Sequence, residues 1–180
     1  MIYTTSIIST GFIKSKDNQI ILERFKENMT VDLYIETNAR GPKVKNGIGM
    51  YLLECEVHGQ PYTKHDFCRY QEVSAIELTL NTLIAALARM DKKSDIHIHV
   101  SNDSVYGILS NDWHLQWQKR GWINSRDNPV AHAKEWERII ELLEPHSYTV
   151  TNGRHSFTNW MQEQIKNSNK YVQEEIKEDE

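Results

Sequence analysis

The sequence predicts an α/β fold with a mixed five-stranded sheet: an antiparallel three-strand meander, further parallel strands, and helices packed on both faces. Three observations carry this prediction. Residues 31–37 alternate apolar and polar side chains, and two more strand-like runs follow across turns. At Ser74 the apolar spacing changes to that of an amphipathic helix. Strands and helices then alternate, which is typical of a mixed sheet covered by helices.

Three strands are expected before Ser74. They cover residues 31–37, 48–57 and 62–70. The second and third runs flank the turn sequence HGQP at 58–61, which is a hairpin signal. The three strands are therefore expected to form the meander.

Helices and strands are expected to alternate after the meander. The first helix begins with a capping box, because Ser74 precedes Glu77 by three residues. In order, the expected elements are a helix at 74–90, a strand at 95–101, short helices at 103–110 and 112–120, a helix from Asn128-Pro129 to Leu143, a strand at 147–151 and a last helix from Phe157.

The chain has 180 residues, which fits one domain of ordinary size. We divide it into an N-terminal arm or pair of extra strands at 1–30, the main domain at 31–167 and an acidic C-terminal tail at 168–180. The N-terminus lacks the pattern of a secretory signal, and the longest apolar run, at 83–88, is too short to span a bilayer. No membrane association is expected.

The balance of charged residues makes the chain acidic, with 21 Lys and Arg against 25 Asp and Glu. If such a chain binds nucleic acid, the positive charge must be local or supplied by metal ions. Its two cysteines, Cys55 and Cys68, are too few for a disulfide framework and favour a cytoplasmic location. The sequence leaves the oligomeric state open, with a monomer preferred.

Three acids lie where the expected sheet delivers side chains to one rim. Glu36 is late in the first strand, Glu77 is in the first turn of the long helix, and Asp103 follows the fourth strand. Each has an ordinary explanation: an exposed strand position, a partner for Ser74, or a helix cap. Together they form the oxygen-rich set that hard divalent cations require, which suits a two-metal phosphodiester hydrolase.

These acids lie in stretches that resemble the type 1 ribonuclease H family. The matching stretches are VDLYIETNA (31–39) with GIGMYLL (47–53), SAIELTLNTLIAAL (74–87), HVSNDSVYGI (99–108), WHLQWQKRGW (113–122) and NPVAHAKEWERI (128–139). The resemblance covers residues 31–167 and implies a ribonuclease H-like fold. It also implies an endonuclease that cuts the RNA strand of RNA/DNA hybrids with two Mg²⁺ or Mn²⁺ ions, leaving 5′-phosphate ends.

By this resemblance the metal ligands are Glu36, Glu77, Asp103 and Glu163. The family's fourth acid lies four residues after an Asn, as Glu163 does after Asn159, although a competing placement puts Asn159 itself at the acid position. We prefer Glu163. The family has Asp at the first and fourth positions, so Glu at both favours an alternative function: a catalytically weakened nucleic-acid-binding module of the same fold.

The resemblance also implies further site residues. The family has a mobile His before its last helix, and here Gly153 takes that position with His155 two residues later. His155 is either a catalytic residue that relays a proton or helps product leave, or an ordinary loop residue. For Trp113 and Trp136 we prefer packing roles. The residues expected to bind nucleic acid are Asn38, Trp117, Lys119, Arg120, Trp122 and Asn159.

Overall fold

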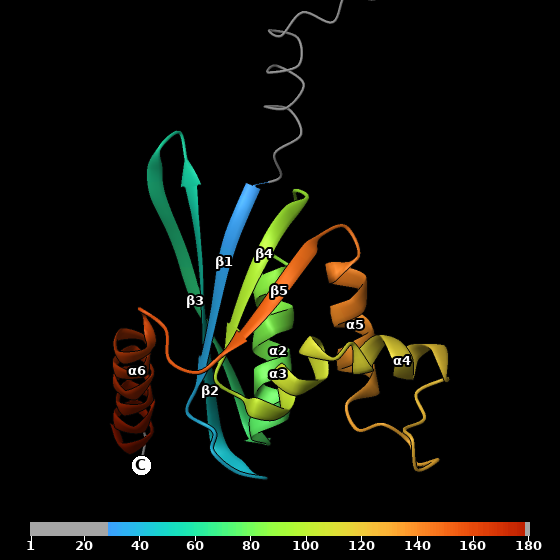
Figure 1. The fold of residues 1–180 in the computed structure, drawn as a ribbon. Helices are drawn as coiled ribbons and strands as arrows, with labels where there is room; N and C mark the ends of the chain where they lie inside the picture. The colour runs from blue at the N-terminus through green and yellow to red at the C-terminus, as the bar shows by residue number, and fades with distance from the viewer. Residues whose placement is uncertain (1–28, 179–180) are drawn as a thin grey trace, which may run out of the picture.

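The structure, a computed structural model, describes the backbone of residues 29–178 and the side chains as far as residue 168. Residues 1–28 of the expected N-terminal arm lie outside the described part. The elements in Figure 1 are, in chain order, β1 (Met29–Thr37), β2 (Val44–Val57), β3 (Gln60–Val73), α2 (Ala75–Leu87), β4 (Ser94–Val100), α3 (Asp103–Ser110), α4 (Trp113–Lys119), α5 (Ala133–Leu143), β5 (Ser147–Asn152) and α6 (Thr158–Glu178).

The strands form one mixed sheet in the order β3-β2-β1-β4-β5. β1 pairs with β2, and β2 with β3, in antiparallel fashion. β4 is parallel to both β1 and β5. The predicted five-stranded mixed sheet is therefore confirmed. Because β1, β4 and β5 are parallel, their carboxyl ends meet at one rim (Figure 1).

Residues of β1 alternate between two hydrophobic cores, since successive strand side chains point to opposite faces. Leu33 and Ile35 pack in the large core with α2 and α5. Tyr34 packs on the other face in a smaller core. The smaller core comprises Tyr34, Ile48, Met50, Leu52, Met161 and Ile165. Glu36 shares the parity of Tyr34, so it lies on the face that α6 covers.

The largest differences from the sequence expectation are at two helix boundaries. The helix expected from Asn128 begins only at Ala133. The Asn124 side-chain oxygen accepts the backbone N–H groups of Arg126 at 2.8 Å and Asn128 at 3.1 Å, which closes a turn before the helix. At the other end, α6 continues through the acidic segment to Glu178. None of the helices in the described part is long and apolar enough to cross a membrane.

Candidate functional site

A pocket of about 650 Å³ opens where the carboxyl ends of β1 and β4 meet the start of α6. This rim is where parallel strands of α/β proteins place ligands. Two acids and two arginines supply all the charged side chains of its lining. The lining includes Glu36, Asp103, Arg40, Arg154, Asn159 and Gln162.

Glu36 is buried at the base of the pocket, with only 2% of its surface exposed. Its Oε1 accepts a hydrogen bond from Thr158 Oγ1 at 3.1 Å. Its Oε2 accepts from Gln162 Nε2 at 2.6 Å and from Ser101 Oγ at 3.4 Å. Three donors, two on α6 and one directly after β4, therefore fix the orientation of this carboxylate.

His155 is the fourth neighbour of Glu36. Its Nε2 lies 3.1 Å from Glu36 Oε1, off the direction of a good hydrogen bond, and its side chain is only 5% exposed. The backbone N–H of Phe157 donates to Nδ1 at 3.3 Å, which leaves the ring proton on Nε2, facing the carboxylate. The ring also lies 4.7 Å from that of Tyr34. The structure thus places His155 beneath the pocket as a fixed partner of Glu36.

The pKa of Glu36 reflects this enclosure. Burial alone raises the pKa, but the His155 ring beside the carboxylate and hydrogen bonds from Gln162 and Thr158 lower it below the ordinary value of 4.5. Glu36 is consequently a carboxylate at neutral pH. Hydrogen bonds from Thr158, Gln162 and Ser101 stabilise its negative charge.

We predict that Glu36 makes stability depend on pH. A carboxyl group with a lowered folded-state pKa stabilises the fold above its unfolded-state pKa and loses that effect as the pH falls through the folded-state pKa. Glu36→Gln should cost about 1–3 kcal/mol near pH 7, because an amide cannot accept all the donors. Urea unfolding in EDTA should show that this difference stays constant from about pH 7 to about pH 5 and narrows as the pH falls below the ordinary pKa of 4.5. A difference that stays constant with pH would contradict the assignment.

Asp103 reaches the pocket as the first residue of α3. The N-cap of α3 is Asn102, whose side-chain oxygen accepts the N–H groups of Ser104 and Val105, both at 3.1 Å. Asp103 is therefore not needed as the cap. Its Oδ1 accepts from Asn152 Nδ2 at 2.6 Å, which orients the carboxylate.

Glu77 lies in the first turn of α2. The pocket lining includes Ala75, two residues earlier, but not Glu77. Its backbone N–H donates to Ser74 Oγ at 3.1 Å, so the expected capping by Ser74 is present. Within residues 29–168 its carboxylate makes no hydrogen bond or ion pair with another side chain.

The start of α6 presents amides to the pocket. Asn159 and Gln162 line it, whereas Glu163 is exposed on the helix surface outside the lining. Successive helical residues are rotated by about 100°, so the helix face that turns Gln162 toward Glu36 turns its neighbour away. The structure thus brings Glu36, Asp103 and Asn159 together and leaves the preferred Glu163 outside.

Sequence reasoning missed the residues that hold Glu36. Thr158 and Gln162 are four residues apart on α6, a spacing that places them on one helix face, and this was the available signal. Arg154 was also missed. Its guanidinium contacts Asn159 Oδ1, and it lines the pocket.

The residues expected to bind nucleic acid have mixed environments. Asn38 ties the β1–β2 hairpin together, because its Nδ2 donates to Asn46 O at 3.0 Å and its Oδ1 accepts from Ile48 N–H at 2.8 Å. Trp122 packs against the large core, and Lys119 is exposed.

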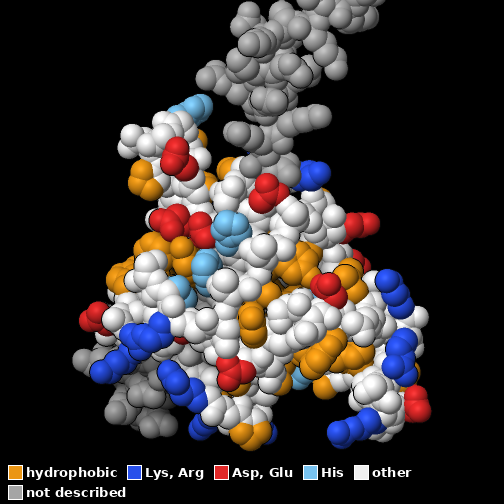
Figure 2. Space-filling model, in the orientation of Figure 1, with side chains coloured by type: hydrophobic (Ala, Val, Ile, Leu, Met, Phe, Trp, Pro, Cys, Tyr) orange, Lys and Arg blue, Asp and Glu red, His pale blue; other side chains and the backbone are white. Residues whose placement is uncertain are grey.

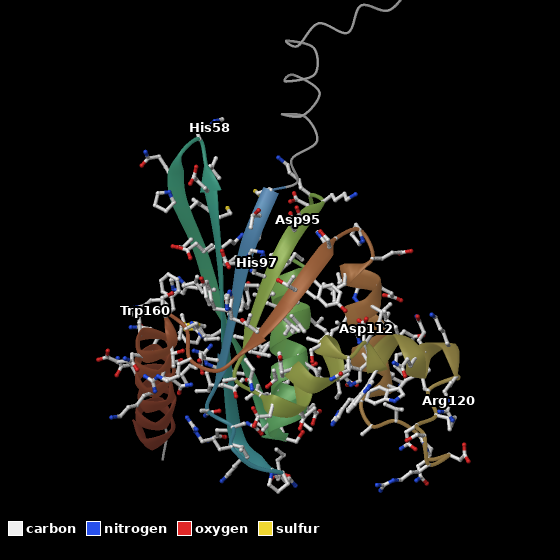
Figure 3. All side chains as sticks on the ribbon, in the orientation of Figure 1. His58, Asp95, His97, Asp112, Arg120 and Trp160 are labelled. Carbon is white, nitrogen blue, oxygen red and sulfur yellow. The ribbon has the colours of Figure 1, made fainter. Side chains whose placement is uncertain are left out.

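A second hollow, of about 380 Å³, contains Trp117 and Arg120. Trp113 also lines it and is 47% exposed, so the packing role preferred for Trp113 is wrong. Trp136, only 1% exposed, does pack in the core as expected. Figure 3 shows Arg120 beyond α4, on the opposite flank of the molecule from Trp160 on α6.

The pocket offers ligands for one hard cation. In the part of the chain that the structure describes, no group of three or more His, Cys, Asp or Glu side chains is placed to hold a metal ion. Glu36, Asp103 and the Asn159 amide oxygen nevertheless suit one Mg²⁺, which often takes one or two carboxylates plus water and substrate phosphate. The two-ion arrangement does not fit this lining, which includes neither Glu77 nor Glu163.

Comparison with known proteins agrees with this fold. No family model matches the chain. The ribonuclease H of Clostridium botulinum strain Hall is 24% identical over 117 residues, covering 65% of this chain and 77% of that protein. The crystal structure of LC9-RNase H1, a type 1 RNase H with the type 2 active-site motif, superposes with a TM-score of 0.61 at 12% identity, covering 76% of this chain and 70% of that one.

A second solved structure extends the likeness over more of the chain. The foamy viral protease-reverse transcriptase in complex with RNA/DNA hybrid superposes with a TM-score of 0.55 at 10% identity, covering 88% of this chain and 21% of that one. At these identities the solved structures establish the fold, and the curated relatives supply the relationship in sequence. The chain therefore has the ribonuclease H fold and is a relative of the bacterial ribonucleases H.

Proposed function

We propose that this protein is a divalent-cation-dependent endonuclease that hydrolyses the RNA strand of RNA/DNA hybrids. The observation that carries the proposal is the meeting of Glu36 and Asp103 in one pocket at the carboxyl rim of the sheet. The ribonuclease H relatives, and the hybrid bound to the foamy viral neighbour, support the substrate.

The proposed reaction needs a cation and an oriented water. Glu36, Asp103 and Asn159 would hold the cation, which lowers the pKa of water and polarises a phosphoryl oxygen. The water oxygen bonds to phosphorus as it gives up a proton to solvent, and the bond from phosphorus to the 3′-oxygen breaks. That oxygen takes up a proton, which leaves 3′-hydroxyl and 5′-phosphate ends.

We propose the second hollow as the contact for the DNA strand. Trp113 and Trp117 give it aromatic surface, and Arg120 and Arg126 give it positive charge. Figure 2 shows Lys and Arg side chains gathered at the lower left and lower right of the molecule. Such groups fix the position of a phosphate backbone without reading its sequence.

The proposed setting is a monomer in the cytoplasm. Cys55 and Cys68, the only cysteines, are both free. Free thiols suit a reducing compartment.

A catalytically weakened nucleic-acid-binding module is the second candidate function. The hydrogen bonds to Glu36 favour it. Thr158 donates to one carboxylate oxygen, and Ser101 and Gln162 donate to the other, so both oxygens are already occupied. A cation that binds Glu36 must compete with these donors. The two candidates predict the same hybrid binding and differ in cleavage.

Cleavage of a labelled RNA/DNA hybrid tests the proposal. We expect cutting with Mn²⁺ at least as fast as with Mg²⁺, because Mg²⁺ demands more regular octahedral geometry, and no cutting in EDTA. A DNA duplex of the same sequence should be spared, since it lacks 2′-hydroxyls. Binding of the hybrid without cleavage in either ion would favour the second candidate. Undiminished cleavage in EDTA, or equal cutting of duplex DNA, would refute the proposed activity.

A further inference from the structure

We infer that the pocket takes a single divalent cation and that Arg154 binds the scissile phosphate, supplying there the second positive charge. This inference rests on the proposed function and deepens it. It assigns a substrate contact to a residue outside the predicted site.

The first argument is the charge of the pocket. Glu36 and Asp103 are balanced by Arg40 and Arg154, so the formal charges of the lining cancel. A cluster of four carboxylates needs two divalent cations for neutrality, but this lining needs none. One divalent cation already makes the pocket positive, as a site for phosphodiester anions should be.

The second argument is the hold on Glu36. Its Oε1 accepts from Thr158 and its Oε2 from Gln162, at 3.1 and 2.6 Å. To bridge two cations, this carboxylate would have to release donors on both oxygens. Because both of its oxygens already accept hydrogen bonds, this carboxylate is suited to binding one cation at most.

The third argument is the placement of Arg154. It follows Gly153, whose φ of +101° suits glycine, and whose N–H donates to Val100 O at 3.3 Å, which ties the loop to β4. The Arg154 guanidinium contacts Asn159 Oδ1 and is thereby kept at the pocket. A guanidinium has five N–H donors, so others remain for the paired hydrogen bonds that it forms with phosphate.

Arg154→Ala, Arg154→Lys and the control Arg138→Ala test the inference. Arg138 is an exposed arginine on α5, paired with Glu141 at 2.8 Å. Hybrid cleavage in saturating Mn²⁺ should show that Arg154→Ala lowers kcat by about 100- to 1,000-fold and also raises KM, because the lost contact holds the phosphate before and during the reaction. Arg154→Lys should recover part of the loss, because lysine restores the positive charge but not the paired N–H donors of the guanidinium. Arg138→Ala should match the wild type.

Mn²⁺ titration followed by electron paramagnetic resonance gives a readout independent of activity. We expect one bound ion per chain in both the wild type and Arg154→Ala. Two ions per chain in the wild type, or an unchanged kcat in Arg154→Ala, would overturn the inference.

A failure of the proposed function is distinguishable from a failure of this inference. If the wild type cuts no hybrid, uridine 5′-monophosphate with Mn²⁺ serves as the probe of the phosphate contact. Arg154→Ala should then weaken its binding at least about tenfold, the effect of one charge-assisted contact, while Arg138→Ala leaves it unchanged. Equal affinities in all variants would reject the role of Arg154.

Discussion

Asp103→Asn is expected to lower the rate of hybrid cleavage by about a thousandfold or more, the effect of losing several kcal/mol of transition-state stabilisation. Asp103 is the exposed carboxylate of the pocket, and Asn152 already orients one of its oxygens. The amide keeps the shape of the side chain and an acceptor for Asn152. It removes the negative charge that attracts the cation.

The measurement combines cleavage with Mn²⁺ binding and urea unfolding. Asp103→Asn should bind Mn²⁺ more weakly and unfold as the wild type does, because α3 is capped by Asn102. Asp91→Asn, in the exposed segment after α2, is the matched control and should leave all three quantities unchanged. If Asp103→Asn cleaves within about tenfold of the wild type, Asp103 is not central to the reaction.

The position of Glu36 could be predicted from local pattern. Apolar Leu33 and Ile35 alternate with polar residues at 32, 34 and 36. This alternation predicts which β1 side chains share a face of the sheet. Likewise, the end of β4 and the cap sequence after it place Asp103 at the rim. Both predictions depend only on residues close in the chain.

The surroundings of Glu36 could not be predicted in the same way. Thr158 and Gln162 are separated from it by 122 and 126 positions in the chain, so their contact depends on how α6 docks. That docking is set by Met161 and Ile165, which pack against the sheet in the smaller core. Asn159 and Glu163 are four residues apart and lie on neighbouring positions of one helix face, so sequence spacing alone could not choose between them.

The start of α5 shows a second limit. Asn128-Pro129 is a good helix-opening sequence, but the Asn124 side chain captures the N–H groups of Arg126 and Asn128. His132, at a φ of +58°, then separates this turn from the helix at Ala133. Side-chain capture of this kind competes with helix formation and is not visible in the apolar spacing.

Asn159→Ala is expected to lower hybrid cleavage by about 10- to 100-fold, the usual effect of losing a group that supports a metal site. Asn159 lines the pocket and its Oδ1 holds Arg154. Glu163→Gln should change the rate by no more than about twofold, because Glu163 is an exposed residue outside the pocket lining. The sequence-based preference for Glu163 as the fourth ligand predicts the opposite: a larger loss of rate for Glu163→Gln than for Asn159→Ala.

The two variants lie one helical turn apart on α6, so each controls for damage to the helix in the other. Mn²⁺ affinity separates the placements further. Asn159→Asp puts a third carboxylate at the pocket and should bind Mn²⁺ more tightly, whereas Glu163→Gln should bind it as the wild type does. If instead Glu163→Gln lost both cleavage and Mn²⁺ affinity while Asn159→Ala kept them, α6 would have to turn Glu163 into the pocket when substrate and cation bind. The contacts of Thr158 and Gln162 with Glu36 would then have to break in the active state.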